Sequence, residues 1–217
     1  DVDKLLEITS TPFAMPQECV KRTDRRMKIA VAYDAAFNFV YRENIDRLKE
    51  WGEVSFFTPL KDKHLPEADW VYLPGGYPEL FAPRLQKNKQ LMEELKSYAE
   101  SGGKIFAECG GMMFLTQSIV TDKGKEYPMC GVLPFKSTMK GACLHLGYRS
   151  MEMHGENWKG HEFHYSELEN PGDLPSIAKL RSAKGKEVDT PVYRYKNVIA
   201  GYTHWYWGEK DIFKLWE

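Results

Sequence analysis

Short apolar runs alternate with amphipathic segments along the first half of this chain. The run at 28–33 predicts a buried strand, and the apolar positions of 41–51 recur at helical spacing until Gly52. A longer amphipathic segment, 84–100, predicts a second helix that ends at the glycine pair 102–103. Three further apolar runs predict strands, at 54–57, 69–73 and 105–107.

This alternation predicts an α/β fold in which a mostly parallel sheet carries helices on both faces. The second half differs in character, because Gly, aromatic and β-branched residues replace the helical pattern. It favours an antiparallel extension of the same sheet. The strands expected there lie near 145–153, 161–168, 191–196 and 198–203.

Residues 1–26 do not share this pattern. They carry charged and turn-forming residues and a single short apolar cluster. We interpret them as a linker or as the end of a missing N-terminal domain, with a true N-terminal extension as the alternative. The first convincing strand begins at Met27, so one domain is expected over 27–217.

The composition is that of an ordinary globular protein, because 42% of the 217 residues are hydrophobic, 28% are charged and the formal net charge is -1. Such a charge gives no reason to expect a nucleic acid or an acidic membrane as partner. No apolar run approaches the roughly 18 residues that span a bilayer, and no signal peptide is visible. The four cysteines lack metal-ligand spacing, so we expect free thiols in a reducing cytoplasm.

One cysteine stands where a strand is expected to turn into a helix. The run 105–107 is followed by Glu108, Cys109 and two glycines, and an apolar helical pattern then begins. A turn that exposes a nucleophile has this pattern. Cys109 is therefore a candidate nucleophile that forms an acyl-enzyme, and the alternative is a small buried hydrophobic residue.

A thiol is mostly protonated at neutral pH and needs a base. Of the six histidines, His204 ends a strand-like run 95 positions (204 minus 109) after Cys109, and we predict it to be that base. Attack on a carbonyl also needs donors for the developing oxyanion. The backbone N–H groups of Gly76 and Gly110 are the candidates, although a simple tight turn also explains Gly76.

The densest polar and aromatic segment is 160–166. Its His161 and His164 are three positions apart, which at strand spacing puts them on opposite faces, and no third ligand is evident. We therefore predict no metal here and favour a strand that lines the substrate site.

The chain also resembles the class I (triad-type) glutamine amidotransferase domain of cobyrinic acid a,c-diamide synthase. The matching segments follow the family's order over almost the whole chain, and together they are highly specific. They are 41–44, 73–80, 107–112, 146–149, 160–166 and 202–204. The resemblance implies a class I glutamine amidotransferase-like, flavodoxin-like α/β domain.

The resemblance implies glutaminase chemistry. Cys109 would form a γ-glutamyl thioester, His204 would relay the proton to the leaving ammonia, and water would release glutamate. The ammonia would pass to an N-terminal synthetase domain that amidates the a and c carboxylates of cobyrinic acid in cobalamin biosynthesis. Because the chain has no GxxxxGK[ST] loop, ATP and Mg are expected only in that missing ATP-binding domain, with no cofactor in this chain.

Further residues receive roles through the same resemblance. His164, Tyr165 and Ser166 would line the glutamine pocket. Tyr77 and Glu79 would hold the glutamine or meet the synthetase domain, and the alternative is that they only cap the helix after the turn.

Two positions depart from the wider class. Tyr206 stands two residues after His204, where class I enzymes usually place a Glu that orients the histidine. Either the Cys–His pair works as a dyad, or Glu162 or a backbone carbonyl holds the imidazole. Glu108 stands where many members have Gly, and we expect its side chain to be strained or to point away from the sheet.

Three other interpretations stay open at this point. The same glutaminase role serves nickel-sirohydrochlorin a,c-diamide synthase. A non-catalytic binding or interface module would keep the fold without the chemistry, consistent with the missing Glu. A thiol hydrolase or chaperone-like protein would also use an elbow cysteine, and 146–149 and 160–166 argue against it by resemblance. The oligomeric state is open, and a homodimer is compatible with the sequence.

Overall fold

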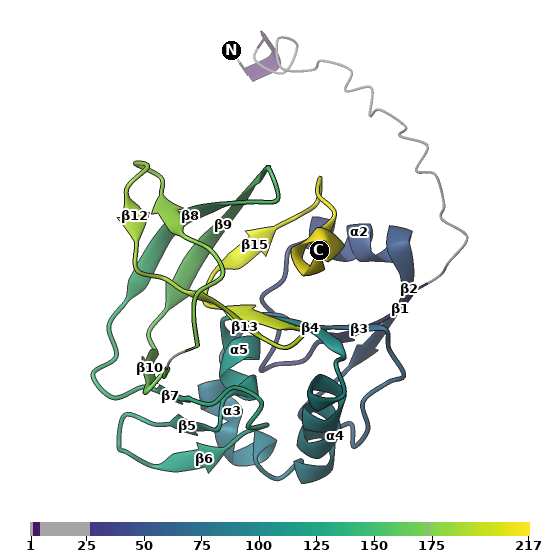
Figure 1. The fold of residues 1–217 in the computed structure, drawn as a ribbon, viewed down its shortest axis with the longest axis vertical. Coiled ribbons are helices and arrows are strands. Elements are labelled where there is room, and N and C mark those ends of the chain that lie inside the picture. The colour runs from purple at the N-terminus through teal and green to yellow at the C-terminus, as the bar shows by residue number, and fades with distance from the viewer. Residues whose placement is uncertain (1, 5–26, 173) are drawn as a thin grey trace.

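A six-stranded sheet forms the centre of the protein (Figure 1). The computed structural model describes residues 2–4, 27–172 and 174–217, so the interpretation of 1–26 lies almost wholly outside the described residues. The strand order is β13-β14-β4-β3-β1-β2, and every pair is parallel except β13 with β14. The strands are β1 (Met27–Ala32), β2 (Gly52–Phe57), β3 (Trp70–Leu73), β4 (Lys104–Glu108), β13 (Val192–Tyr195) and β14 (Val198–Gly201).

Alternating side chains give this sheet two buried faces. One face, which includes Ala30, Val71 and Ile105, packs against three helices. These are α3 (Pro78–Leu85), α4 (Lys89–Glu100) and α5 (Gly110–Leu115). The other face packs against α2 (Arg42–Trp51), the 3-10 helix η1 (Ile212–Trp216) and part of a second sheet. The predicted α/β fold with helices on both faces is confirmed.

The predicted helix at 84–100 is wrong in extent. The structure has two helices there, because α3 already begins at Pro78 and α4 begins only at Lys89. Asn88 separates them with a ψ of 57°, outside the helical region. Its buried amide donates to the carbonyls of Pro59 (2.8 Å) and Asp62 (2.7 Å), so it holds a neighbouring loop instead of continuing a helix.

The antiparallel extension is only partly as predicted. β13 joins the central sheet, but β8 (His145–Met153) and β9 (Glu156–His164) belong to a separate five-stranded sheet of order β12-β11-β8-β9-β15. The strand predicted at 161–168 thus lies several residues earlier. The other members are β11 (Leu180–Ser182), β12 (Glu187–Val188) and β15 (His204–Tyr206).

A third, four-stranded sheet was not predicted. Its order is β10-β7-β5-β6, and each strand has three residues, too few to show an alternating pattern in the sequence. The strands are β5 (Ser118–Val120), β6 (Glu126–Pro128), β7 (Lys136–Thr138) and β10 (Glu167–Glu169).

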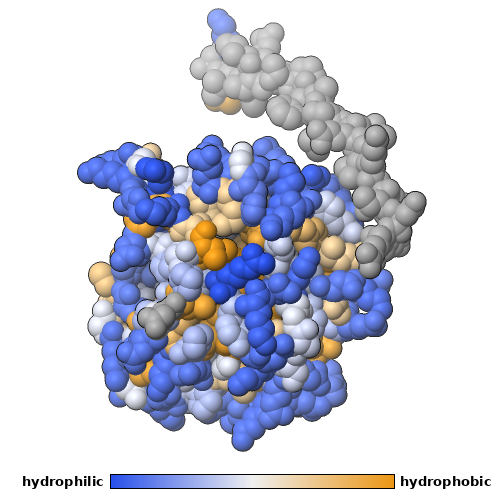
Figure 2. Space-filling model, viewed as in Figure 1, coloured by the Kyte–Doolittle hydropathy of each residue, from blue (hydrophilic) through white to orange (hydrophobic). Residues whose placement is uncertain are grey.

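Polar side chains cover most of the face seen in Figure 2, and apolar ones reach the surface in the middle of the view. In the described part of the chain, no helix is long and apolar enough to cross a membrane.

Candidate active site

Cys109 occupies a strained elbow between β4 and α5. Its φ of 46° and ψ of -107° are rare for a residue with a side chain, and such backbone strain concentrates at functional sites. The Cys109 N–H donates to the Gly201 carbonyl at 2.7 Å, which ties the elbow to β14. A Cβ at Gly111 would overlap the Leu73 carbonyl, so only glycine lets α5 start this close to β3.

Burial is the main cause of the raised pKa of the Cys109 thiol. The side chain is buried, and its sulfur lies 3.8 Å from the Phe163 carbonyl oxygen. Burial and the nearby Glu79 carboxylate raise the thiol pKa, whereas the backbone N–H groups of Gly110 and Gly76 lower it, and the result is a pKa of about 12. Both predicted oxyanion donors therefore face the sulfur.

His204 is the first residue of β15 and is also buried. Its ring lies 4.3 Å from the Phe39 ring and 5.2 Å from that of His161, measured between centroids. Burial, assisted by His161 and His164, lowers the His204 pKa to about 3, so the imidazole is neutral. The buried His204 Nδ1 has no hydrogen-bond partner among the described residues.

The turn after β3 connects the thiol and the imidazole. A Cβ on Gly75 would overlap the His204 ring, so this imidazole lies directly on the Gly75 backbone. The next residue, Gly76, turns its N–H toward the Cys109 sulfur. Cys109, His204, Gly76 and Gly110 thus meet at the carboxyl edge of the central sheet, where α/β folds bind ligands.

The expectation that Glu162 orients His204 is wrong. Glu162 lies two residues before His164 on the same side of β9, and its Oε1 is 2.9 Å from His164 Nε2. Its Oε2 accepts from Arg149 Nε at 2.7 Å and from the Thr190 hydroxyl at 2.9 Å. His204 instead lies opposite His161 in the pairing of β15 with β9. The side chain of His161 is on the other face of β9 from that of Glu162.

The pKa of Glu162 is consistent with these hydrogen bonds. Burial alone would raise the Glu162 pKa, but the bonds from His164 and Thr190 and the positive charge of Arg149 hold it at about 2. Glu162 is therefore the anion of a buried ion-pair network beside the thiol site.

Two other predicted pocket residues belong to this buried network. His164 Nδ1 lies 2.8 Å from the Ser166 carbonyl, and its ring stacks on Tyr202 at 3.6 Å. The Ser166 hydroxyl is 2.9 Å from the Tyr202 hydroxyl and donates to Met113 Sδ in α5. His164 and Ser166 thus support the elbow helix from behind.

The remaining predicted residues lie nearer the surface. Tyr165 and Tyr77 are 40% and 44% exposed, so both can meet a ligand or a partner. Glu79 lies in the first turn of α3 without a side-chain partner in the described residues, and burial raises its pKa. The Glu79 charge helps to raise the pKa of the Cys109 thiol. Glu79 therefore lies near the thiol, which a residue that only capped the helix at the surface would not.

One group of the described residues has metal-ligand chemistry, namely His145, Glu162 and His164. The two imidazoles are stacked 4.7 Å apart with planes only 6° from parallel, so their in-plane nitrogen lone pairs do not converge on one point. Arg149 already neutralises Glu162. The arrangement does not suit a metal ion without rotation of a ring.

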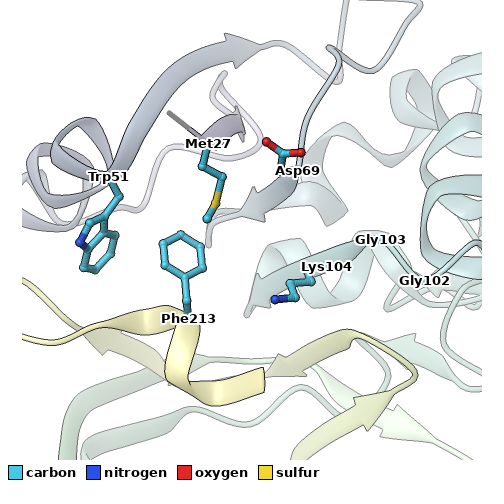
Figure 3. Close-up of a pocket in the computed structure, with 7 residues that line it drawn as sticks. All are labelled: Met27, Trp51, Asp69, Gly102, Gly103, Lys104 and Phe213. Carbon is cyan, nitrogen blue, oxygen red and sulfur yellow. The ribbon is translucent and has the colours of Figure 1, made fainter. Parts of the chain in front are cut away.

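A cavity of about 500 Å³ lies away from the thiol (Figure 3). It opens at the amino ends of β1, β3 and β4, the edge opposite to Cys109. Two aromatic side chains and one residue of each charge line it, and the lining contains no Ser, Thr or Cys. The lining residues are Met27, Trp51, Asp69, Gly102, Gly103, Lys104 and Phe213.

Residues 28–212 match the profile of the CobB/CobQ-like glutamine amidotransferase domain. The chain belongs to this family. It is 41% identical to the cobyrinate a,c-diamide synthase of Picrophilus torridus over 86% of the chain, 38% identical to that of Synechocystis over 97%, and 36% identical to that of Leptospira interrogans over 95%. These alignments cover 42%, 46% and 48% of the relatives, so the chain spans about half their length.

Solved structures agree on the fold of this amidotransferase domain. One glutamine amidotransferase has a TM-score of 0.53 at 20% identity, covering 81% of this chain and 89% of its own. A glutamine amidotransferase from Thermotoga maritima has a TM-score of 0.54 at 16% identity, covering 83% of this chain and 76% of its own.

Sequence reasoning missed three side chains around the amidotransferase site. Phe39 packs on His204, whereas Asn44 and Tyr72 bond to groups beside His204 and Cys109. Asn44 lies within the matched segment 41–44, but helical spacing marks it only as a buried position. Such contacts join distant parts of the chain and leave no local pattern.

Proposed function

We propose that this domain hydrolyses glutamine to glutamate and ammonia through a thioester on Cys109. The observation that carries the proposal is the shared turn at residues 75 and 76. There the His204 imidazole rests on Gly75, and the Gly76 N–H faces the nucleophilic sulfur.

The chemistry starts from a neutral pair. The thiol gives its proton to the His204 imidazole while Sγ attacks the side-chain carbonyl carbon of glutamine. The oxygen becomes an oxyanion, which the N–H groups of Gly76 and Gly110 stabilise. The imidazolium then returns the proton to the departing nitrogen, and ammonia leaves. Water, deprotonated by the neutral His204, then attacks the thioester, the C–S bond breaks to free glutamate, and the imidazolium returns the proton to the Cys109 sulfur.

We infer that the ammonia serves an ATP-dependent synthetase half, which amidates the a and c carboxylates of cobyrinic acid in cobalamin biosynthesis. Two facts support this inference: the named relatives are cobyrinate a,c-diamide synthases, and the chain spans about half their length. ATP and Mg would belong to that other half.

A partly exposed apolar stripe beside the site supports such a partner. Leu146 and Tyr148 occupy alternate positions of β8, and Leu144 immediately precedes this strand; the three side chains are 46% (Leu144), 62% (Leu146) and 74% (Tyr148) exposed. In the strand register Leu146 pairs with Phe163, whose carbonyl contacts the Cys109 sulfur. We propose that the synthetase half covers this stripe and receives ammonia there.

The decisive experiment measures glutamate release from glutamine by the chain together with its synthetase half. Cys109→Ala and Cys109→Ser are expected to lower the rate by at least about 10³-fold, because no other group can form the thioester. Cys143→Ser removes an exposed thiol and serves as the matched control, with a rate equal to wild type. Glutamate release that persists in Cys109→Ala would overturn the mechanism, and a wild type without release would favour a non-catalytic domain.

A further inference from the structure

The strand that carries His204 has a strand neighbour on one side only. β15 is the edge of its sheet and pairs with β9 through His204 with His161, Trp205 with Gly160 and Tyr206 with Lys159. Along its other edge, side chains from the first half of the protein take the place of a strand among the described residues.

Asn44 makes two of these bonds from α2. Its Nδ2 donates to the Trp205 carbonyl at 2.8 Å, and its Oδ1 accepts from the Trp207 N–H at 2.9 Å. One donor and one acceptor that reach residues two apart reproduce the bonding of a parallel strand neighbour. The Asn44 side chain is fully buried, so these bonds are protected from water.

Glu108 makes the third bond. Its Oε1 accepts from the Trp205 N–H at 2.8 Å, and its Oε2 accepts from the Tyr72 hydroxyl at 2.6 Å. Glu108 immediately precedes Cys109, and Trp205 immediately follows His204. A single carboxyl group therefore couples the backbone of the elbow to the backbone of the histidine strand.

We propose that Asn44 and Glu108 are positioning residues that together act as the second neighbour strand of β15 and hold His204 in register with Cys109. The proposal rests on the proposed glutaminase function, because it assigns His204 the role of base. It also accounts for the absence of a Glu two residues after His204. Tyr206 stands there with its ring 5.7 Å from that of Tyr41, and His204 Nδ1 has no partner in the described structure.

The first test compares two buried asparagines. Asn44→Ala removes two buried bonds to the β15 segment, whereas Asn88→Ala removes one buried bond to Pro59 and one partly buried bond to Asp62. With the intact chain and its synthetase half, Asn44→Ala is expected to lower kcat for glutamine hydrolysis about 10- to 100-fold and to change KM by no more than about twofold. The reason is that a misplaced base stabilises the transition state less. Asn88→Ala is expected to lower the melting temperature similarly and to keep the wild-type kcat.

The second test separates position from charge at Glu108. Glu108→Gln keeps an oxygen that accepts from the Trp205 N–H, whereas Glu108→Ala removes it. If the role is positioning, Gln restores most of the kcat that Ala loses. If Gln loses as much as Ala, the role needs the carboxyl group itself and not only its accepting oxygen, and the positioning role of Glu108 is refuted.

A readout independent of activity distinguishes this inference from the proposed function. In protein labelled with ¹⁵N-histidine, the ring signals of His204 are expected to shift and broaden in Asn44→Ala and to stay unchanged in Asn88→Ala. Equal signals or equal kcat changes in the two variants would overturn the positioning role. If wild type shows no Cys109-dependent glutamate release, the proposed function fails, and the histidine signals still decide whether Asn44 positions the ring.

Discussion

At the scale of single residues, one cause tunes Cys109 and His204 in opposite directions. Burial raises the pKa of the thiol to about 12 and lowers the pKa of the imidazole to about 3. Both groups are therefore neutral near pH 7, and no thiolate–imidazolium pair exists before glutamine binds. In the proposed mechanism, proton transfer therefore accompanies attack, when the N–H groups of Gly76 and Gly110 can stabilise the new negative charge.

This pairing predicts the pH dependence of Cys109 alkylation. The thiolate is the reactive form, so with a pKa of about 12 the iodoacetamide rate should rise about tenfold per pH unit from 7 to 9 without levelling. The measurement uses a Cys143→Ser background, which removes an exposed thiol, and subtracts the rate of Cys109→Ala in that background. A plateau below pH 9 would show that the free enzyme already holds a thiolate.

Glu108 predicts a pH dependence of stability. Burial raises its pKa from 4.5 to about 8, against the bonds from Tyr72 and Trp205 that lower it. The folded protein thus binds this proton more tightly than the unfolded chain. The stabilisation is fully present below pH 4.5 and is lost as pH rises toward about 8. Between pH 5 and 8, urea unfolding should show a larger loss of stability for wild type than for Glu108→Gln, and parallel curves would contradict the assignment.

At the scale of elements, two turns between strands and helices bring the site together. The elbow after β4 presents the thiol, and the turn after β3 places a bare glycine backbone under the imidazole. Because β3 and β4 are adjacent parallel strands, their carboxyl ends deliver both turns to the same edge. His204 comes from the five-stranded sheet, so its position depends on how that sheet packs against the central sheet.

The turn after β3 gives a substitution test. Gly75→Ala puts a Cβ into the space of the His204 ring, so the ring must move, at a cost of about 1–3 kcal/mol in stability. We expect glutaminase kcat to fall at least about tenfold, by displacement of the base. Gly141→Ala is the control, because a Cβ there meets nothing within 4 Å, and any loss of stability comes only from its φ of 67°, which disfavours alanine. Wild-type kcat in Gly75→Ala would show that the imidazole need not rest on the turn.

The sequence predicts well what local pattern determines. The alternation of strands and helices places Cys109 at the end of β4, and β1, β2, β3, β4 and α2 lie close to their predicted positions. The sheet to which β8 and β9 belong could not be predicted, because alternation shows which face of a strand is buried but not what buries it. The predicted contact between Glu162 and His204 was likewise wrong. Several histidines were possible partners of this carboxylate, and the fold places it on His164.

At the scale of the whole molecule, the two halves of the chain contribute different parts of one site. The first half supplies Cys109, Gly76 and Gly110 at the edge of the parallel sheet, and the second half supplies His204 on β15. Asn44 and Glu108 join the halves through bonds to the backbone of β15. The apolar stripe of Leu144, Leu146 and Tyr148 runs along and just before β8 of the same second sheet, next to this site. In the proposed complex, a partner that covers the stripe would contact the sheet that also carries His204.

This arrangement predicts that the stripe is the surface through which this domain binds the synthetase half of the proposed synthase. Leu146→Ser with Leu144→Ser should weaken association with the synthetase half at least about tenfold in a sedimentation or calorimetric titration, since covering a Leu that is about half exposed contributes about 1 kcal/mol. Phe56→Ser is the matched control, because Phe56 is 49% exposed and packs on Tyr33 rather than in the stripe. Equal affinities for wild type and the double variant would place the interface elsewhere. If the stripe is the interface, ammonia-dependent amidation with added ammonium should survive in the double variant while glutamine-dependent amidation falls, because only the transfer between the halves is lost.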